Sequence, residues 1–92
     1  MGKIKIKKSK NLIYQDFSFL PDGTTTFRNP PSKSVLQRFE HYERKLILHF
    51  ENQFITTIYA KNLEGERELF KIVQKLPEFI GKSYEEILNY EF

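Results

Sequence analysis

The pattern that most constrains this fold is a pair of apolar segments on either side of Glu51-Asn52-Gln53. Residues 45–50 and 54–60 are rich in strand-forming side chains, so they predict the two strands of a hairpin. A two-residue loop would mix polar and apolar side chains on both faces of this hairpin. A three-residue loop sorts them, and we therefore expect one, with Asn52 or Gln53 in the left-handed conformation.

The sorted register gives this second hairpin a core face and an outer face. The core face would carry Leu46, Leu48, Phe50, Phe54, Ile58 and Ala60. The outer face would carry Lys45, Ile47, His49, Ile55, Thr57 and Tyr59. Because this outer face is unusually apolar for a surface in water, we expect it to meet a partner, unless a helix covers it within a three-layer core. The candidate partner-binding residues are Ile47, His49, Ile55 and Tyr59.

A first hairpin is predicted over residues 12–28, around the turn Pro21-Asp22-Gly23. Proline suits the first turn position, and glycine supplies the left-handed residue of a three-residue loop. That loop length places Asp16 opposite Arg28 as an opposite-charge pair. The face that we expect to join the core carries Ile13, Phe17, Phe19 and Phe27. The outward face carries Tyr14, Asp16, Ser18, Thr24, Thr26 and Arg28.

Residues 34–44 have two interpretations. After a break at two prolines, Ser34 and Gln37 have the spacing of a capping box, and apolar residues follow at helical spacing. These signals favour a helix over residues 34–44. A further strand of the sheet is the competing interpretation.

Two more helices are predicted in the C-terminal half of the chain. The first spans residues 63–76, with Asn62 as its N-cap and a proline directly after it as the stop signal. The second spans residues 83–90 and begins with a capping box formed by Ser83 and Glu86. Both would dock their apolar sides onto the sheet.

Five lysines fall within residues 3–10, where they alternate with Ile4 and Ile6. In a strand this alternation would turn the isoleucines to the core and a row of ammonium groups outward. Such a row can contact phosphates or an acidic surface, or it can protect a sheet edge from pairing. Tyr14, on the outward face, would stack on a base. The candidate residues for binding nucleic acid or an acidic surface are Lys3, Lys5, Lys7, Lys8, Lys10, Tyr14 and Arg28.

The length of 92 residues predicts one domain over residues 1–92. The expected architecture is α+β: an antiparallel sheet of two hairpins, with the lysine-isoleucine segment as a candidate extra strand, packed against two or three helices. The chain has no cysteine, which excludes a disulfide scaffold and thiolate chemistry and favours an intracellular, cytoplasmic setting. No apolar run approaches the roughly 20 residues that a membrane span needs.

No catalytic or metal-binding pattern stands out. The chain has two histidines, His41 and His49. Asp16 or Glu40 would have to lie beside one of them to form an acid–base pair, and no spacing forces that contact. Glu40, His41 and Glu43 do not converge on one helical face as metal ligands would. We therefore expect no enzyme, no metal and no cofactor.

Charge is unevenly distributed along the chain. Residues 1–46 carry ten Lys or Arg against four Asp or Glu, and residues 47–92 carry five against eight. This asymmetry argues against a general polyanion binder and is compatible with a homodimer. We expect a small non-enzymatic module that binds and modulates a protein or nucleoprotein partner, in the style of regulators and inhibitors encoded by phages and mobile elements. The alternative is a weak, largely sequence-independent nucleic-acid binder that uses the N-terminal lysines.

Overall fold

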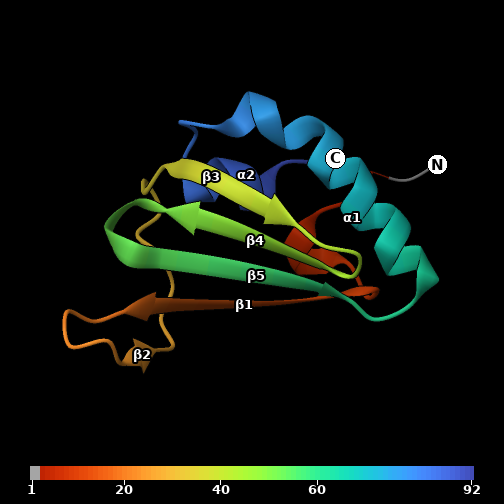
Figure 1. The fold of residues 1–92 in the computed structure, drawn as a ribbon. Coiled ribbons are helices and arrows are strands. Elements are labelled where there is room, and N and C mark those ends of the chain that lie inside the picture. Colours follow the sequence, from red (N-terminus) through yellow and green to blue (C-terminus); the bar gives the residue numbers. More distant parts are fainter. Residues whose placement is uncertain (1–2) are drawn as a thin grey trace.

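The computed structural model describes residues 3–92, which form a five-stranded antiparallel sheet with helices on one of its faces (Figure 1). The strands, in the spatial order β2-β1-β5-β4-β3, are β1 Leu12–Phe19, β2 Thr25–Thr26, β3 Leu36–His41, β4 Lys45–Phe50 and β5 Phe54–Ala60. The α-helices are α1 Leu63–Lys75 and α2 Tyr84–Asn89, and the short 3-10 segments are η1 Ile6–Lys8, η2 Glu51–Gln53 and η3 Leu76–Phe79. The predicted α+β class is therefore confirmed.

The β4–β5 hairpin has the predicted register. His49 pairs with Ile55, and the turn contains Asn52 and Gln53 with φ of 60° and 67°. The side chains that this register places together are buried against the helices: Leu46, Leu48, Phe50, Phe54, Ile58 and Ala60. The local pattern was sufficient here because a one-residue slip would turn all these side chains of one strand to the other face.

The helix predicted over residues 34–44 is wrong, because this segment contains β3. β3 pairs with β4 through a tight turn in which the Tyr42 amide donates to the Lys45 carbonyl at 2.8 Å. A β-bulge directly after Leu36 brings Leu36 and Phe39 to the same face, three residues apart. That spacing resembles a helical pattern, although a bulged strand produces it.

The first hairpin has the predicted register but the opposite orientation. Ser18 pairs with Thr26, as the three-residue loop requires, and β2 is two residues long. The pairing of β1 with β5 decides which face of β1 enters the core, and it turns Leu12, Tyr14, Asp16 and Ser18 towards the helices. The expectation that Ile13, Phe17, Phe19 and Phe27 belong to the core is therefore wrong. Phe19 is 41% exposed and Phe27 is 70% exposed.

Asp16 shows how the polar face of β1 is accommodated in the interior. Asp16 is 7% exposed, and its carboxylate accepts three side-chain hydrogen bonds. The donors are the Thr56 hydroxyl at 2.5 Å, the Tyr84 hydroxyl at 2.5 Å and the Asn29 amide at 2.8 Å. They replace the predicted cross-strand partner Arg28, and they tie β5, α2 and the loop before β3 to β1.

Both C-terminal helices begin at their predicted caps. The Asn62 side chain accepts from the Gly65 amide at 2.8 Å, and Ser83 and Glu86 form a reciprocal capping box. Glycine is required at position 65, because a β-carbon there would overlap the carbonyl oxygen of Asn11. The start of α1 can therefore press directly against the segment that enters β1.

The lysine-isoleucine segment forms the turn η1 rather than the candidate strand. The amides of Lys8 and Ser9 both donate to the Lys5 carbonyl at 3.0 Å, and this turn inserts Ile6, 1% exposed, into the core. The Ser9 hydroxyl also donates to Glu68 on α1. Ile6 is buried between α2 and β1. This burial and the local hydrogen bonds stabilise the segment, which does not pair with the sheet.

Candidate functional site

One face of the sheet is covered by no helix in the described part of the chain, and we call it the open face (Figure 1). Alternate residues of a strand share a face. The side chains of the open face therefore occupy alternate positions on four strands, β1, β3, β4 and β5. They are Ile13, Gln15, Phe17, Phe19, Arg38, Glu40, Lys45, Ile47, His49, Ile55, Thr57 and Tyr59. Phe27, just after β2, lies beside them.

Aromatic and aliphatic side chains dominate the open face. The ring centroid of Phe17 lies 5.7 Å from that of Phe19 and 6.5 Å from that of Phe27, in edge-to-face geometry. Four large side chains of this face are well exposed: Phe27 at 70%, Ile13 at 51%, Tyr59 at 42% and Phe19 at 41%. Phe27, Tyr59 and Phe19, together with neighbouring residues, border a shallow depression of about 580 Å³. Contiguous apolar surface of this kind is typical of an interaction site.

All four candidate partner-binding residues lie on the open face. His49 pairs directly with Ile55, and Ile47 lies two residues before it on β4. Tyr59 is 42% exposed, whereas Ile55, which pairs with Phe17 on β1 and His49 on β4, is 8% exposed. The alternative of a helix over this face is wrong for residues 3–92, whose helices pack on the other face.

The part of the open face that comes from β1 and Phe27 is not predicted from the sequence. Phe17, Phe19 and Phe27 share a face, as expected, but the pairing of β1 with β5 turns that face away from the helices. A signal for this orientation exists in the sequence. Asp16 and Thr56 are both polar, and their hydrogen bond forms only when the polar face of β1 points inward.

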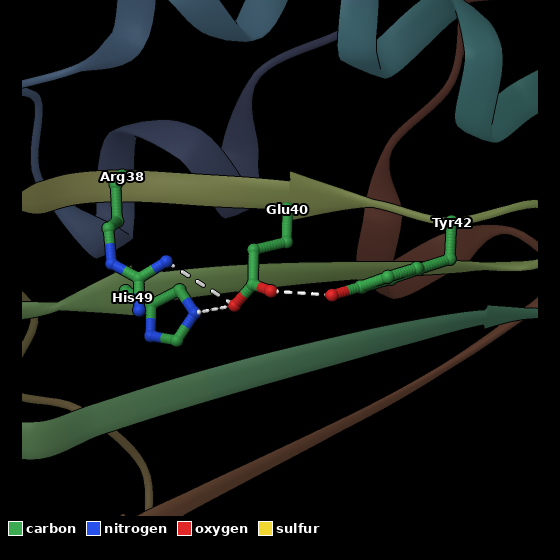
Figure 2. Close-up of polar contacts among 4 residues, drawn as sticks. All are labelled: Arg38, Glu40, Tyr42 and His49. Carbon is green, nitrogen blue, oxygen red and sulfur yellow. Dashed lines mark hydrogen bonds and ion pairs between the residues drawn. The ribbon is translucent and has the colours of Figure 1, made fainter.

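A polar cluster from β3, β4 and the turn between them lies at the edge of the open face. Figure 2 shows the Glu40 carboxylate between the other members of this cluster. The Tyr42 hydroxyl donates to one carboxylate oxygen at 2.6 Å, and Nε2 of His49 lies 2.6 Å from the other. Arg38 approaches that second oxygen at 3.4 Å. Strand register explains this grouping, because Arg38 pairs with His49 and Glu40 follows two residues later on the same face.

These contacts keep Glu40 ionised. The hydrogen bond from Tyr42 and then that from His49 lower the pKa of Glu40 from 4.5 to about 2. The same contact with Glu40 raises the pKa of Tyr42, because it stabilises the protonated hydroxyl. Glu40 therefore presents a fixed negative charge, and its chemical effect is to orient His49 rather than to accept protons near neutral pH.

Only one of the acid–base contacts considered from the sequence forms in the described chain. His49 meets Glu40, as Figure 2 shows. His41 pairs with Leu46 and so belongs to the helix-covered face, at the exposed end of β3. Asp16 is engaged in the interior by Thr56 and other donors. The open face thus has one oriented histidine beside a permanent carboxylate.

Lys45 adds a positive charge to the open face. Its ammonium lies 5.4 Å from the ring centroid of Tyr42 and 5.9 Å from that of Tyr59. These distances are typical of cation–π contacts, which hold the side chain along the sheet surface. Lys45 and Glu40 are the charged side chains that border the central depression, and their charges cancel.

The candidate nucleic-acid residues do not form one continuous surface. Four of them, Lys3, Lys5, Lys8 and Lys10, border a depression of about 470 Å³ that also contains Glu68 and Glu91. The ammonium of Lys5 lies 3.8 Å from the Glu91 carboxylate. Lys7 points elsewhere, with its ammonium 5.8 Å from the ring centroid of Tyr84.

Two predicted members of that surface lie away from the lysines. Tyr14 packs on the helix-covered face, so its expected outward position is wrong. The Arg28 guanidinium lies 5.2 Å from the ring centroid of Phe54, which pairs with Ser18 near the far end of β1. About 20 Å of strand separates that end from the lysines that precede β1.

Within residues 3–92, no three His, Asp or Glu side chains gather in a way that would hold a metal ion. No helix of the same range has the length and apolar character to cross a bilayer. Comparison with known proteins finds no matching family model, no matching curated protein and no matching solved structure.

Proposed function

We propose that this chain is a small non-enzymatic interaction module that binds a protein, free or within a nucleoprotein, through the open face and so modulates it. The observation that supports this most strongly is the exposure of Phe19 on β1 and of Phe27 just after β2, on the same face as Tyr59. Exposing large apolar side chains to water is unfavourable by roughly 25 cal/mol for each Å² of apolar surface. A partner that covers them recovers that free energy on binding.

The composition of the open face favours a protein over a nucleic acid. A phosphate backbone is bound by clustered Lys and Arg, whereas the charges of Lys45 and Glu40 at the central depression cancel. Ile13, Ile47 and Ile55 are aliphatic and have no ring to stack on a base. An apolar centre with polar side chains at its rim is instead the usual anatomy of a protein–protein interface.

The polar cluster supplies orientation to such an interface. Glu40 stays anionic and the Arg38 guanidinium lies 3.4 Å from it, so this rim offers charges of both signs. Charged rims contribute more to specificity and association rate than to affinity. A partner with an apolar contact surface and a cation that reaches Glu40 fits this arrangement.

The proposal is tested with a purified partner that co-purifies with the chain. Phe27→Ser and Tyr59→Ser each remove an exposed side chain, so we expect the free energy of unfolding to change little and the affinity to fall about tenfold or more. Phe70→Ser on α1 is the matched control, because Phe70 is 56% exposed on the helical side. Weaker binding in the Phe70 variant, with the two open-face variants unchanged, would contradict the proposal.

Nucleic-acid binding by the N-terminal lysines is the second candidate, supported by the depression that Lys3, Lys5 and two further lysines border. We expect weak binding, because Glu68 and Glu91 share that depression. Fluorescence anisotropy of short DNA and RNA at low and near-physiological salt tests it. Binding that weakens steeply with salt and is lost in Lys8→Gln/Lys10→Gln would support this candidate, and no binding at low salt would eliminate it.

A further inference from the structure

One edge of the sheet is left largely unpaired. β2 pairs only with Ser18 and Phe19 of β1, so no strand within residues 3–92 lies beside residues 12–17 on that side. Figure 1 shows this stretch of β1 at the border of the sheet, next to the short β2. The edge is therefore a row of main-chain groups open to a further strand.

The hydrogen-bond pattern identifies those main-chain groups. The Lys61 amide donates to the Asn11 carbonyl at 2.9 Å, so odd-numbered residues of β1 direct their main-chain groups towards β5. Even-numbered residues direct theirs the other way, as the bond from the Leu20 amide to the Thr24 carbonyl confirms. The amides and carbonyls of Leu12, Tyr14 and Asp16 therefore point to the open edge.

The opposite edge of the sheet is protected, whereas this one is not. At β3, a bulge interrupts the strand, and Leu36 exchanges hydrogen bonds of 2.9 and 2.8 Å with Lys82 and Gly81. Arg38 also places a charge on that strand. Residues 12–17 contain no lysine, arginine, proline or bulge, and the one charged side chain, Asp16, points into the interior. Natural proteins usually block such edges against pairing with another strand. An edge without these blocking features therefore indicates that a further strand pairs with it.

We propose that this edge pairs with the same edge of a second copy of the chain. Two β1 strands related by a two-fold axis at Tyr14 run antiparallel, with Leu12 of each copy opposite Asp16 of the other. The donors and acceptors of these residues then face each other, because an antiparallel strand is complementary to itself. β2 bounds the free stretch at one end and the turn at Lys10 and Asn11 bounds it at the other, which limits the register.

The side chains on the open face are compatible with this pairing. Ile13 would lie opposite Gln15 of the second copy and diagonal to its Ile13 and Phe17. Ile13 is 51% exposed in the single chain, and the pairing would reduce this exposure from one side. Both open faces would remain accessible, as one continuous surface, so the dimer does not depend on the proposed function.

Analytical ultracentrifugation of the full chain across a concentration series tests the dimer. We expect a mass of twice 11.1 kDa at high concentration and dissociation on dilution. Ile13→Lys/Gln15→Lys places four lysines around the two-fold axis and should raise the dissociation constant at least about tenfold. Leu63→Lys/Phe70→Lys, at exposed positions on α1, is the control and should leave that constant unchanged.

Since the chain has no cysteine, a single Gln15→Cys carries a unique spin label. Labels in the dimer should show strong dipolar broadening, because residue 15 of each copy is one position from the two-fold axis and the two labels therefore lie close together. The same label at Phe70 should show none. A chain that stays monomeric at millimolar concentration, or a dimer unaffected by the β1 lysines, would overturn the proposal.

Discussion

Glu40 on β3 and His49 on β4 face each other across the strand pair, with 2.6 Å between the Glu40 carboxylate and Nε2 of His49. They stand at the boundary between the apolar part of the open face and its charged rim. The Tyr42 hydroxyl completes the contact from the other side of the carboxylate. This relationship has consequences for stability that can be measured without a partner.

The stability that Glu40 contributes to the folded protein should be lost in acid. A carboxyl with a lower pKa in the folded than in the unfolded chain stabilises the fold above its unfolded pKa, near 4.5, and loses this contribution as the pH falls to about 2. In Glu40→Gln this contribution is absent at every pH. The difference in unfolding midpoint between wild type and variant should therefore shrink as the pH falls from 4.5 towards 2. A difference independent of pH would contradict the assignment.

Tyr42→Phe should raise the pKa of Glu40, because the Tyr42 hydroxyl is the largest cause of its low value. The hydrogen bond from His49 should keep that pKa below 4.5. NMR titration of the carboxyl carbon of Glu40 in the two proteins measures the shift directly. An unchanged pKa in the Phe variant would show that the contact with the hydroxyl is not maintained in solution.

Tyr84→Phe should destabilise the fold, because it removes a donor from the buried carboxylate of Asp16. Loss of a hydrogen bond to a buried charged group costs about 1–3 kcal/mol in the free energy of unfolding. Tyr42→Phe, which removes a hydroxyl from an exposed carboxylate contact, is the matched comparison and should cost less. Urea unfolding at neutral pH measures the free energy of unfolding of both variants. An equal loss in the two variants would argue against a buried hydrogen bond between Tyr84 and Asp16.

Gly65→Ala should be destabilising although alanine is the better helix former by about 1 kcal/mol. The new β-carbon would overlap the Asn11 carbonyl oxygen, which is main chain and cannot rotate away. A net loss of about 1–3 kcal/mol is expected from such overpacking. Lys71→Ala, at an exposed position on the same helix, should be near neutral in the same urea titration. A stabilised Gly65→Ala protein would contradict the close approach of α1 to the start of β1.

Elements that depend on local signals were predicted from the sequence, and those that depend on distant pairing were not. Asn52 and Gln53 form their turn within the hairpin, and the caps at Asn62 and Ser83 act within one helical turn. β3 was mistaken for a helix because a bulge places Leu36 and Phe39 three residues apart on one face. Neighbouring residues contain no information about such a bulge.

The open face was found only in part for the same reason. The β4–β5 half, with Ile47 and Tyr59, follows from the sorting of side chains in one hairpin. The β1 half requires the register between Asp16 and Thr56, which are 40 residues apart. The contact of Glu40 with His49 likewise requires that residues 34–44 contain a strand.

Site-specific photo-crosslinking in the native cell is the most direct test of protein binding through the open face. A benzophenone amino acid replaces Phe27 in one variant and Phe70 in another, since both side chains are exposed but on different sides of the molecule. Adducts are identified by mass spectrometry and the identified protein is tested for binding in purified form. We predict one defined protein adduct at position 27 and not at position 70. Adducts at position 70 alone, or at neither position, would contradict the account.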